Sequence, residues 1–436
     1  MGLKHESTEI KFPLILRLQL EIHFTLYLKF KQPEHPKPDL PMRYSVLLFF
    51  CFFCSCVVKT RQVLQIPRKD ESGVIKLYFD REGALYPPDL RINPYYFYLE
   101  HLHKRKLAKY SNPEYATLET ALTKYDSLSV LAIRQEYKLQ DRDSMRLFLR
   151  MQDVVRKGIV GDIERNLTQN TTRDLVLFIH GFNDPTPDAF YYSLRKNIEA
   201  HLHSKPVFVE VYWDGLTALG DNPVFTNIWS YAQSNSAKVG LGLRNILNKL
   251  NTNTRLTIVT HSLGASVATH ALFNPGKWPE RFQEELEREY HSENIATPKQ
   301  KDIRIGMLAP AIQGIKVFDH IDYTIPENTA PTITRVIIGF NHFDYAVTKG
   351  GLFASYFGST ALGADDKGEV AKTMAAIKEI NPKIKTVGVD FSLTRKMDSL
   401  TTKKLQRKSP YKQREHGLQF YQQNEHFADF LSALFD

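Results

Sequence analysis

Residues 255–273 read RLTIVTHSLGASVATHALF, and they carry the clearest structural pattern in the chain. The apolar run at 256–259 predicts a buried strand, and the small residues from position 265 onward predict a helix lying close to a sheet. Ser262 stands at the turn between them, with Gly264 two positions later. Such a tight turn exposes a hydroxyl at the strand's carboxyl end, next to a helix N-terminus that stabilises negative charge. Ser262 is therefore a candidate nucleophile. The alternative is a serine that only caps an ordinary helix.

A second stretch strengthens this interpretation. Residues 174–183 read DLVLFIHGFN, an apolar strand that ends in His-Gly-Phe-Asn about 80 residues before the serine. That gap fits one intervening strand–helix repeat, which brings both strand ends to one edge of a parallel sheet. We expect the backbone N–H groups of Phe182 and Leu263 to converge there as an oxyanion hole.

Together, HGFN, Trp213-Asp214-Gly215 and THSLG resemble the α/β-hydrolase superfamily, and the nearest branch is the uncharacterised DUF900-type serine hydrolases. The resemblance covers about residues 171–436. It implies an α/β fold whose mostly parallel central sheet carries helices on both faces. One departure is Thr260, because the usual turn has glycine or another small residue at that position.

A triad acid is expected after the second strand beyond the nucleophile. Residues 333–340 predict that strand, and Asp344 follows it in a segment, Asp-x-Ala-Val, that resembles the acid motif of the family. A buried carboxylate at this position would orient a histidine. Asp319 and Asp322, after the preceding strand, are rival acids.

The general base must come after the last predicted strand, 384–391, which leaves His416 and His426. Asn424 looks like the N-cap of the final helix, so His426 is expected in the first turn of that helix. His416 precedes the helix, where the catalytic histidine of the family lies, and it is the preferred base. Its spacing to the next aromatic residue is looser than the family pattern.

These residues imply a serine hydrolase that cleaves a carboxylic ester through a Ser262–His416–Asp344 triad and an acyl-enzyme. The substrate class is a small-molecule or lipid ester. The same triad would also serve an acyltransferase. A surface-anchored binding protein that keeps the fold without activity is a third possibility.

Composition narrows the function classes. The chain has 436 residues, of which 42% are hydrophobic. Its net charge of +9 is modest for this length, and part of that charge lies in a basic segment at 395–415. We therefore expect no nucleic-acid partner. No histidine or cysteine cluster with metal-ligand spacing occurs, and we expect no metal and no cofactor.

All three cysteines lie near the N-terminus, in an apolar run that follows Met42-Arg43 and ends at Cys54-Ser55-Cys56. A short positive region, an apolar run and small residues at its end are typical of a signal peptide. We expect a bacterial lipoprotein of the cell envelope that is lipidated at Cys56 and membrane-anchored by that lipid. The alternative is a genuine extension ahead of one membrane anchor.

The expected organisation of the chain has four parts. They are a non-native or disordered extension at 1–41, a lipoprotein signal and anchor at 42–56, a largely helical N-terminal subdomain at 57–170, and the hydrolase domain at 171–436. The subdomain contains an alternating, strand-like run at 74–79 and a helical pattern at 145–159. The Gly-rich residues 349–368 are expected to form a mobile insertion over the site, and the alternative is an ordinary surface loop.

Overall fold

A computed structural model describes the part of the chain that carries the predicted hydrolase elements. The described residues are 60–61, 73–79, 83, 85–86, 144–182, 187–202, 204–213, 215, 217–218, 226–273, 298–314, 332–344, 346–347, 362–392 and 416–436. Val58–Asp436 form one compact unit. Cys56, Asp319, Asp322 and the segments predicted at 1–41 and 42–56 lie outside the described residues.

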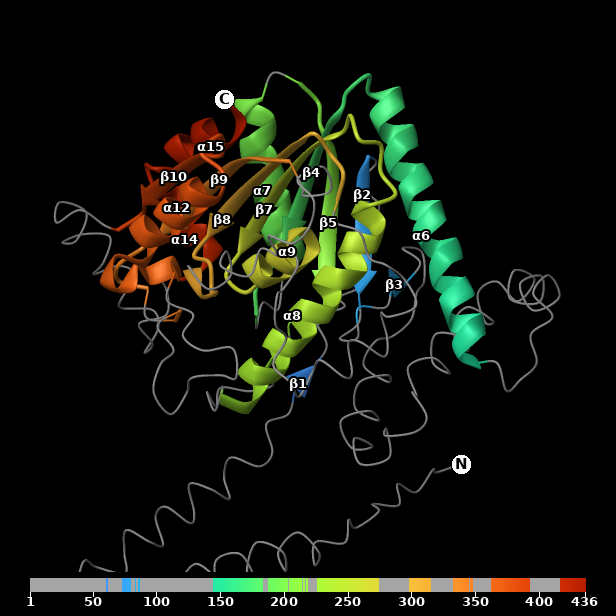
Figure 1. Ribbon diagram of the computed structural model, residues 1–436, viewed down its shortest axis with the longest axis horizontal. Coiled ribbons are helices and arrows are strands. Elements are labelled where there is room, and N and C mark those ends of the chain that lie inside the picture. The colour runs from blue at the N-terminus through green and yellow to red at the C-terminus, as the bar shows by residue number, and fades with distance from the viewer. Residues whose placement is uncertain are drawn as a thin grey trace, which may run out of the picture. The chain divides into compact units, whose positions relative to one another are not determined.

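The centre of this unit is an eight-stranded sheet in the order β10-β9-β8-β7-β4-β5-β2-β3 (Figure 1). Seven strands run parallel, and β3 (Leu85–Tyr86) pairs antiparallel with β2 at the edge. The parallel strands are β2 (Val74–Phe79), β4 (Asp174–Ile179), β5 (Val207–Trp213), β7 (Arg255–His261), β8 (Asp302–Leu308), β9 (Ile333–Phe340) and β10 (Lys385–Asp390). Two short strands, β1 (Thr60–Arg61) and β6 (Thr217–Ala218), pair with each other.

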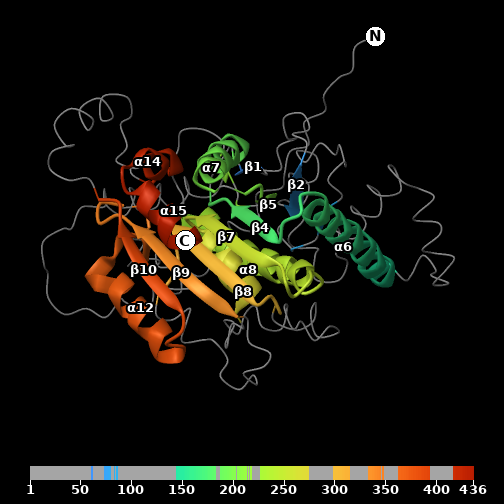
Figure 2. The ribbon, with the colours of Figure 1, turned by 90° about the horizontal axis from the view of Figure 1, so that it is seen from above.

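Helices cover both faces of the sheet (Figure 2). One face carries α6 (Ser144–Gln169), α8 (Thr226–Leu247), α9 (Gly264–Leu272) and α12 (Glu369–Ile380). The other carries α7 (Pro187–His201), α14 (Leu418–Gln423) and α15 (Phe427–Phe435). Short 3₁₀ turns occupy Leu362–Ala364 and Asp366–Gly368. The predicted α/β-hydrolase fold, with a mostly parallel sheet between two layers of helices, is confirmed.

The central strands are apolar on both faces because helices bury both. In β4, Leu177 faces the core shared with α8 and α9, whereas Phe178 faces the core shared with α7. Both side chains are at most 1% exposed. This burial explains why the sequence shows continuous apolar runs here instead of alternation.

The strand predicted at 74–79 is β2, and it lies in the hydrolase sheet beside β5. The side chain of Gln152, on α6, accepts a hydrogen bond from the N–H of Leu85 (2.8 Å) and donates one to its carbonyl (2.9 Å). The described elements of residues 57–170 therefore extend the hydrolase sheet, and the boundary expected near residue 171 falls inside one compact unit. Parallel pairing with β5 accounts for this placement, since it satisfies the backbone of an otherwise open edge.

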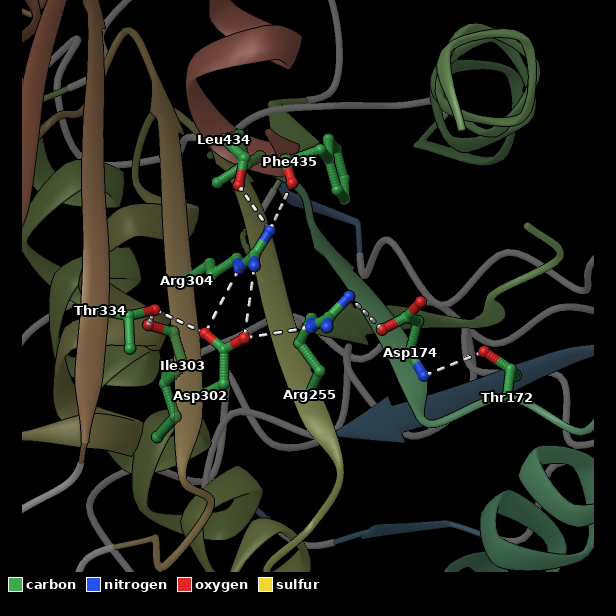
Figure 3. Close-up of polar contacts among 9 residues, drawn as sticks. All are labelled: Thr172, Asp174, Arg255, Asp302, Ile303, Arg304, Thr334, Leu434 and Phe435. Atoms are coloured by element: carbon green, nitrogen blue, oxygen red, sulfur yellow. Dashed lines mark hydrogen bonds and ion pairs between the residues drawn. The ribbon is translucent and has the colours of Figure 1, made fainter. Parts of the chain in front are cut away.

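Charged side chains lie along the amino ends of the strands, opposite the edge where the site forms (Figure 3). Asp302 on β8 binds Arg255 of β7 (3.0 Å) and Arg304 (3.3 Å), and Arg255 also reaches Asp174 of β4 (3.0 Å). Burial alone would raise the pKa of Asp302, but hydrogen bonds from Thr334 and Arg304 and the two guanidinium charges outweigh it and lower that pKa. These pairs tie three neighbouring strands together.

None of the described helices is both long enough and apolar enough to cross a membrane.

Candidate active site

Ser262 occupies a strained turn between β7 and α9. Its backbone lies in the left-handed region, with φ of 53°. Its N–H donates to the carbonyl of Leu308 (2.9 Å), and its own carbonyl accepts from the N–H of Ala311 (3.0 Å). The last residue of β8 and the loop directly after it thus hold the turn in place. A non-glycine residue in this region signals strain that the surrounding structure must support, and such strain is concentrated at functional sites.

Gly264 shows why the turn is so restricted. A Cβ atom at this position would lie 2.4 Å from the carbonyl oxygen of Ile179 and 2.6 Å from that of His180. Both atoms belong to the backbone at the end of β4, which cannot move aside. Only glycine lets α9 begin this close to the neighbouring strand, as the sequence pattern predicted. Thr260 fits at the end of β7 with no exposed surface, so the departure from the family pattern is accommodated.

A continuous hydrogen-bonded chain links Ser262, His416 and Asp344. His416 Nε2 lies 2.9 Å from Ser262 Oγ, and His416 Nδ1 lies 2.7 Å from Asp344 Oδ2. The three residues come from the end of β7, the turn after β9 and the residue pair before α14. Ser262 is 3% exposed and Asp344 is 1% exposed. The His416 side chain between them is 20% exposed, so both ends of the hydrogen-bonded chain are buried and the imidazole is partly open to solvent. Of the two candidate bases, His416 is the one placed beside the serine.

The Asp344 carboxylate is also held by two other groups. Its Oδ1 accepts a hydrogen bond from the N–H of Ala346 (3.1 Å), and its Oδ2 accepts one from the hydroxyl of Tyr421 (3.2 Å). A buried carboxylate needs such partners to remain ionised. Sequence analysis missed Tyr421. Its signal was an aromatic residue five positions after His416, but only the fold shows that its hydroxyl reaches the acid.

His426 lies elsewhere, and here one sequence-based expectation is wrong. Asn424 is not the N-cap of the final helix. It is the C-cap of the short helix α14, and His426 is the N-cap of the final helix, α15. Asn424 Oδ1 nevertheless accepts the N–H of His426 (2.9 Å). The ring of His426 contacts Asp429 (3.1 Å). The reason for the error is local: α14 was not expected between the base and the last helix.

The turn after β4 is held by the buried ring of His180. His180 Nδ1 lies 2.8 Å from the carbonyl oxygen of Gly181, and its Nε2 accepts the N–H of Trp213 (3.2 Å). One nitrogen donates and the other accepts, so the ring is neutral, and burial lowers its pKa to about 4. The peptide bond between Gly181 and Phe182 is planar and trans, so its C=O and N–H groups point in opposite directions. Because His180 holds the Gly181 carbonyl, the Phe182 N–H points to the other side of the turn.

Leu263 is the N-cap of α9 and is almost fully buried. Phe182 is partly buried against the core on the α8 and α9 face. Phe182 follows β4 and Leu263 follows β7. Because these two strands are parallel neighbours, both residues lie at the same edge of the sheet. A Cβ on Gly181 would lie 2.8 Å from the Cβ of Ser262, so the two turns touch. Backbone N–H groups at such a junction suit a developing oxyanion.

Within the described part of the chain, no group of three or more histidine, cysteine, aspartate or glutamate side chains is placed to hold a metal ion.

One family model matches part of the chain. Residues 158–320 match the family model described as "Alpha/beta hydrolase of unknown function (DUF900)". The match contains Ser262, Phe182 and Leu263, whereas Asp344 and His416 lie beyond it. No curated protein and no solved structure gives a match to this chain. The expected resemblance is thereby confirmed: the chain has an α/β-hydrolase fold, and its residues 158–320 match DUF900, a family of α/β hydrolases of unknown function.

Proposed function

We propose that this protein is a serine hydrolase that cleaves a carboxylic ester of a small molecule or lipid. The observation that carries the proposal is the chain of two short contacts from Ser262 through His416 to Asp344. A surface serine that only capped a helix would need neither a histidine at 2.9 Å nor a buried carboxylate behind it.

The reaction would proceed in two acyl-transfer steps. His416 Nε2 accepts the proton of Ser262 as Oγ bonds to the ester carbonyl carbon, and N–H groups of Phe182 and Leu263 stabilise the negative oxygen. The carbon–oxygen bond to the leaving alcohol then breaks, and His416 returns the proton to that alcohol. Water releases the acyl group by the same route. Asp344 keeps the imidazole in the required tautomer and stabilises its protonated form.

Covalent labelling tests the proposal without choosing a substrate. The full chain is treated with a fluorophosphonate probe, and labelling at Ser262 is located by mass spectrometry of the digested protein. We expect Ser262→Ala to abolish labelling and to lower ester hydrolysis by at least about 10³-fold. Ser266→Ala is the matched control, because Ser266 is another buried serine of α9 whose hydroxyl contacts Ser236 (2.8 Å). Equal labelling of wild type and Ser262→Ala would refute the proposal.

We further propose that lipidation at Cys56 attaches the protein to the bacterial cell envelope. The support is the apolar run that ends at Cys54-Ser55-Cys56 in the sequence. Expression of the full chain in a bacterium, followed by membrane fractionation and mass spectrometry, tests this idea. We expect a lipid-modified Cys56 in the membrane fraction and loss of the modification in Cys56→Ser. An unmodified, full-length wild-type chain would contradict it.

A further inference from the structure

His261 is the last residue of β7 and directly precedes the candidate nucleophile. Its side chain is 8% exposed. Its Nε2 lies 2.8 Å from the backbone carbonyl oxygen of His416, and the centroids of the two rings lie 5.0 Å apart. His261 therefore contacts the backbone of His416, and the side chain of His416 connects Ser262 with Asp344.

The geometry determines which nitrogen of His261 carries the proton. A carbonyl oxygen only accepts hydrogen bonds, so Nε2 must be the donor. The other nitrogen, Nδ1, faces the turn after β4: a Cβ atom on Gly181 would lie 3.3 Å from it. The ring thus fills the space between the turn that carries Phe182 and the segment that carries His416.

His261 is held in its neutral form. Its pKa falls to about 3, mainly because the ring is buried and in smaller part because the His416 ring is nearby. A neutral donor suits this location because His416 must become positively charged when it accepts the serine proton. A second positive charge at a ring separation of 5.0 Å would oppose that step.

We propose that His261 is a positioning residue that holds the backbone of His416, so that Nε2 and Nδ1 of His416 reach Ser262 and Asp344 together. This inference rests on the proposed function of the triad. Among the described residues, the other hydrogen bonds of His416 are those of its side chain with Ser262 and Asp344, so the bond from His261 is the one that fixes its carbonyl just before α14. A displacement of about 1 Å in such a constellation can cost roughly 10²-fold in rate.

Three substitutions at one position separate the hydrogen bond from general packing. His261→Ala removes the donor, and we expect kcat for an activated ester to fall about 10- to 100-fold while KM stays within about twofold. His261→Gln carries an amide nitrogen at nearly the position of the histidine Nε2 and should recover most of kcat. His261→Asn places its amide near the position of Nδ1 and should not recover it.

His270→Ala provides the control for loss of a histidine from the same region. His270 is the histidine of α9, and its Nδ1 lies 2.7 Å from the carbonyl oxygen of Ser266, one turn earlier in that helix. We expect its kcat to stay within about twofold of wild type. Gln recovery with a silent His270→Ala supports the proposal, whereas equal kcat in wild type and His261→Ala overturns it.

A readout that does not need turnover separates failure of this inference from failure of the proposed function. The proton between His416 Nδ1 and Asp344 should give a far-downfield proton resonance, identified by its loss in Asp344→Asn. We expect this resonance to broaden or disappear in His261→Ala and to persist in His261→Gln. An unchanged resonance in His261→Ala overturns the positioning role even if Ser262 proves unreactive. Lack of fluorophosphonate labelling of wild type at Ser262 would instead count against the proposed function.

Discussion

His416 Nδ1 lies 2.7 Å from Asp344 Oδ2, although 72 positions separate the two residues in the chain. The carboxylate accepts two further hydrogen bonds and is almost completely buried. Asp344→Asn keeps the size of the side chain but removes the charge that stabilises a protonated imidazole. We expect kcat to fall about 10³- to 10⁴-fold with little change in stability.

The measurement is the rate of hydrolysis of an activated ester, together with the rate of fluorophosphonate labelling. Asp390→Asn is the matched control, because Asp390 also ends a strand of the sheet, but its side chain is about half exposed and accepts the N–H of Ser392 (2.8 Å). Similar losses in both variants would show that Asp344 has no special part in the chemistry.

Glycine substitutions test the packing of the nucleophile turn. Gly264→Ala forces a Cβ to within 2.4 Å of a backbone oxygen of β4, so α9 must shift. We expect a loss of about 3 kcal/mol or more in the free energy of unfolding and loss of labelling at Ser262. Gly158→Ala, on α6, is the matched control, because no other described group outside the backbone of its own helix lies within 4 Å of the new methyl group.

Chemical denaturation of the two glycine variants gives the comparison. Gly158→Ala should be neutral or stabilising by up to about 1 kcal/mol, since alanine is the better helix former. A Gly264→Ala protein as stable and as reactive as wild type would mean that the contact with β4 does not restrict the turn.

Three histidines make stability depend on pH. Burial lowers the pKa of His180 to about 4, of His261 to about 3 and of His270 to about 4, against an ordinary value of 6.5. Between pH 6.5 and about 4 the unfolded chain therefore binds more protons than the folded one, so stability falls as the pH falls. Each histidine contributes roughly 2 kcal/mol of loss between pH 7 and pH 5.

Urea unfolding of the wild type at pH 7 and pH 5 measures this loss. The glutamine in His270→Gln cannot bind a proton in the unfolded state. Between pH 7 and pH 5 the free energy of unfolding of this variant should therefore fall by roughly 2 kcal/mol less than that of the wild type. If wild type and His270→Gln lose the same stability, His270 is not held neutral by the fold.

Arg304, on β8, connects the sheet to the end of the C-terminal helix α15. It donates to the carbonyls of Phe435 (2.6 Å) and Leu434 (3.3 Å) while it pairs with Asp302 (Figure 3). Carbonyls at the end of a helix have no partner within the helix, and a cation there is favourable. We expect Arg304→Ala to lower the free energy of unfolding by about 2–3 kcal/mol.

Arg304→Lys keeps the charge but not the fork of donors, and it should recover only part of that loss. Arg165→Ala is the control, because Arg165 pairs with Asp162 on the exposed surface of α6 (2.8 Å) and should change stability by less than about 0.5 kcal/mol. Thermal and urea unfolding of the three variants provide the values. Equal effects of the two alanine variants would contradict the role of Arg304 at the helix end.

The strand–turn–helix around Ser262 could be predicted from sequence because its requirements are local. Apolar residues form the strand, and small residues follow in the helix. At position 264, glycine fits against β4 because a Cβ atom there would collide with the backbone. The strand of residues 333–340 and the position of Asp344 after it were accessible for the same reason. Hydrophobic runs separated by helical patterns predict a parallel sheet, and the carboxyl ends of its strands must lie along one edge.

The choice between His416 and His426 could not be made from local pattern alone. Both are near the last helix, and the short helix α14, which displaces Asn424 from the expected cap, has only six residues. What separates the two histidines is distance to Ser262 and Asp344, and that distance depends on how α14 and α15 pack against the sheet. The parts played by Tyr421 and His261 depend on the same packing.

Short-range sterics and hydrophobic periodicity are local, so the sequence alone predicts the α/β class, the strand–turn–helix around Ser262 and an acid and a histidine after it in the chain. The tertiary structure was needed to place β2 beside β5 in the sheet and to show that His416, not His426, meets Ser262 and Asp344. It also decided that His261 holds the carbonyl of His416. These contacts join residues 72 to 155 positions apart, and no local preference encodes such distances.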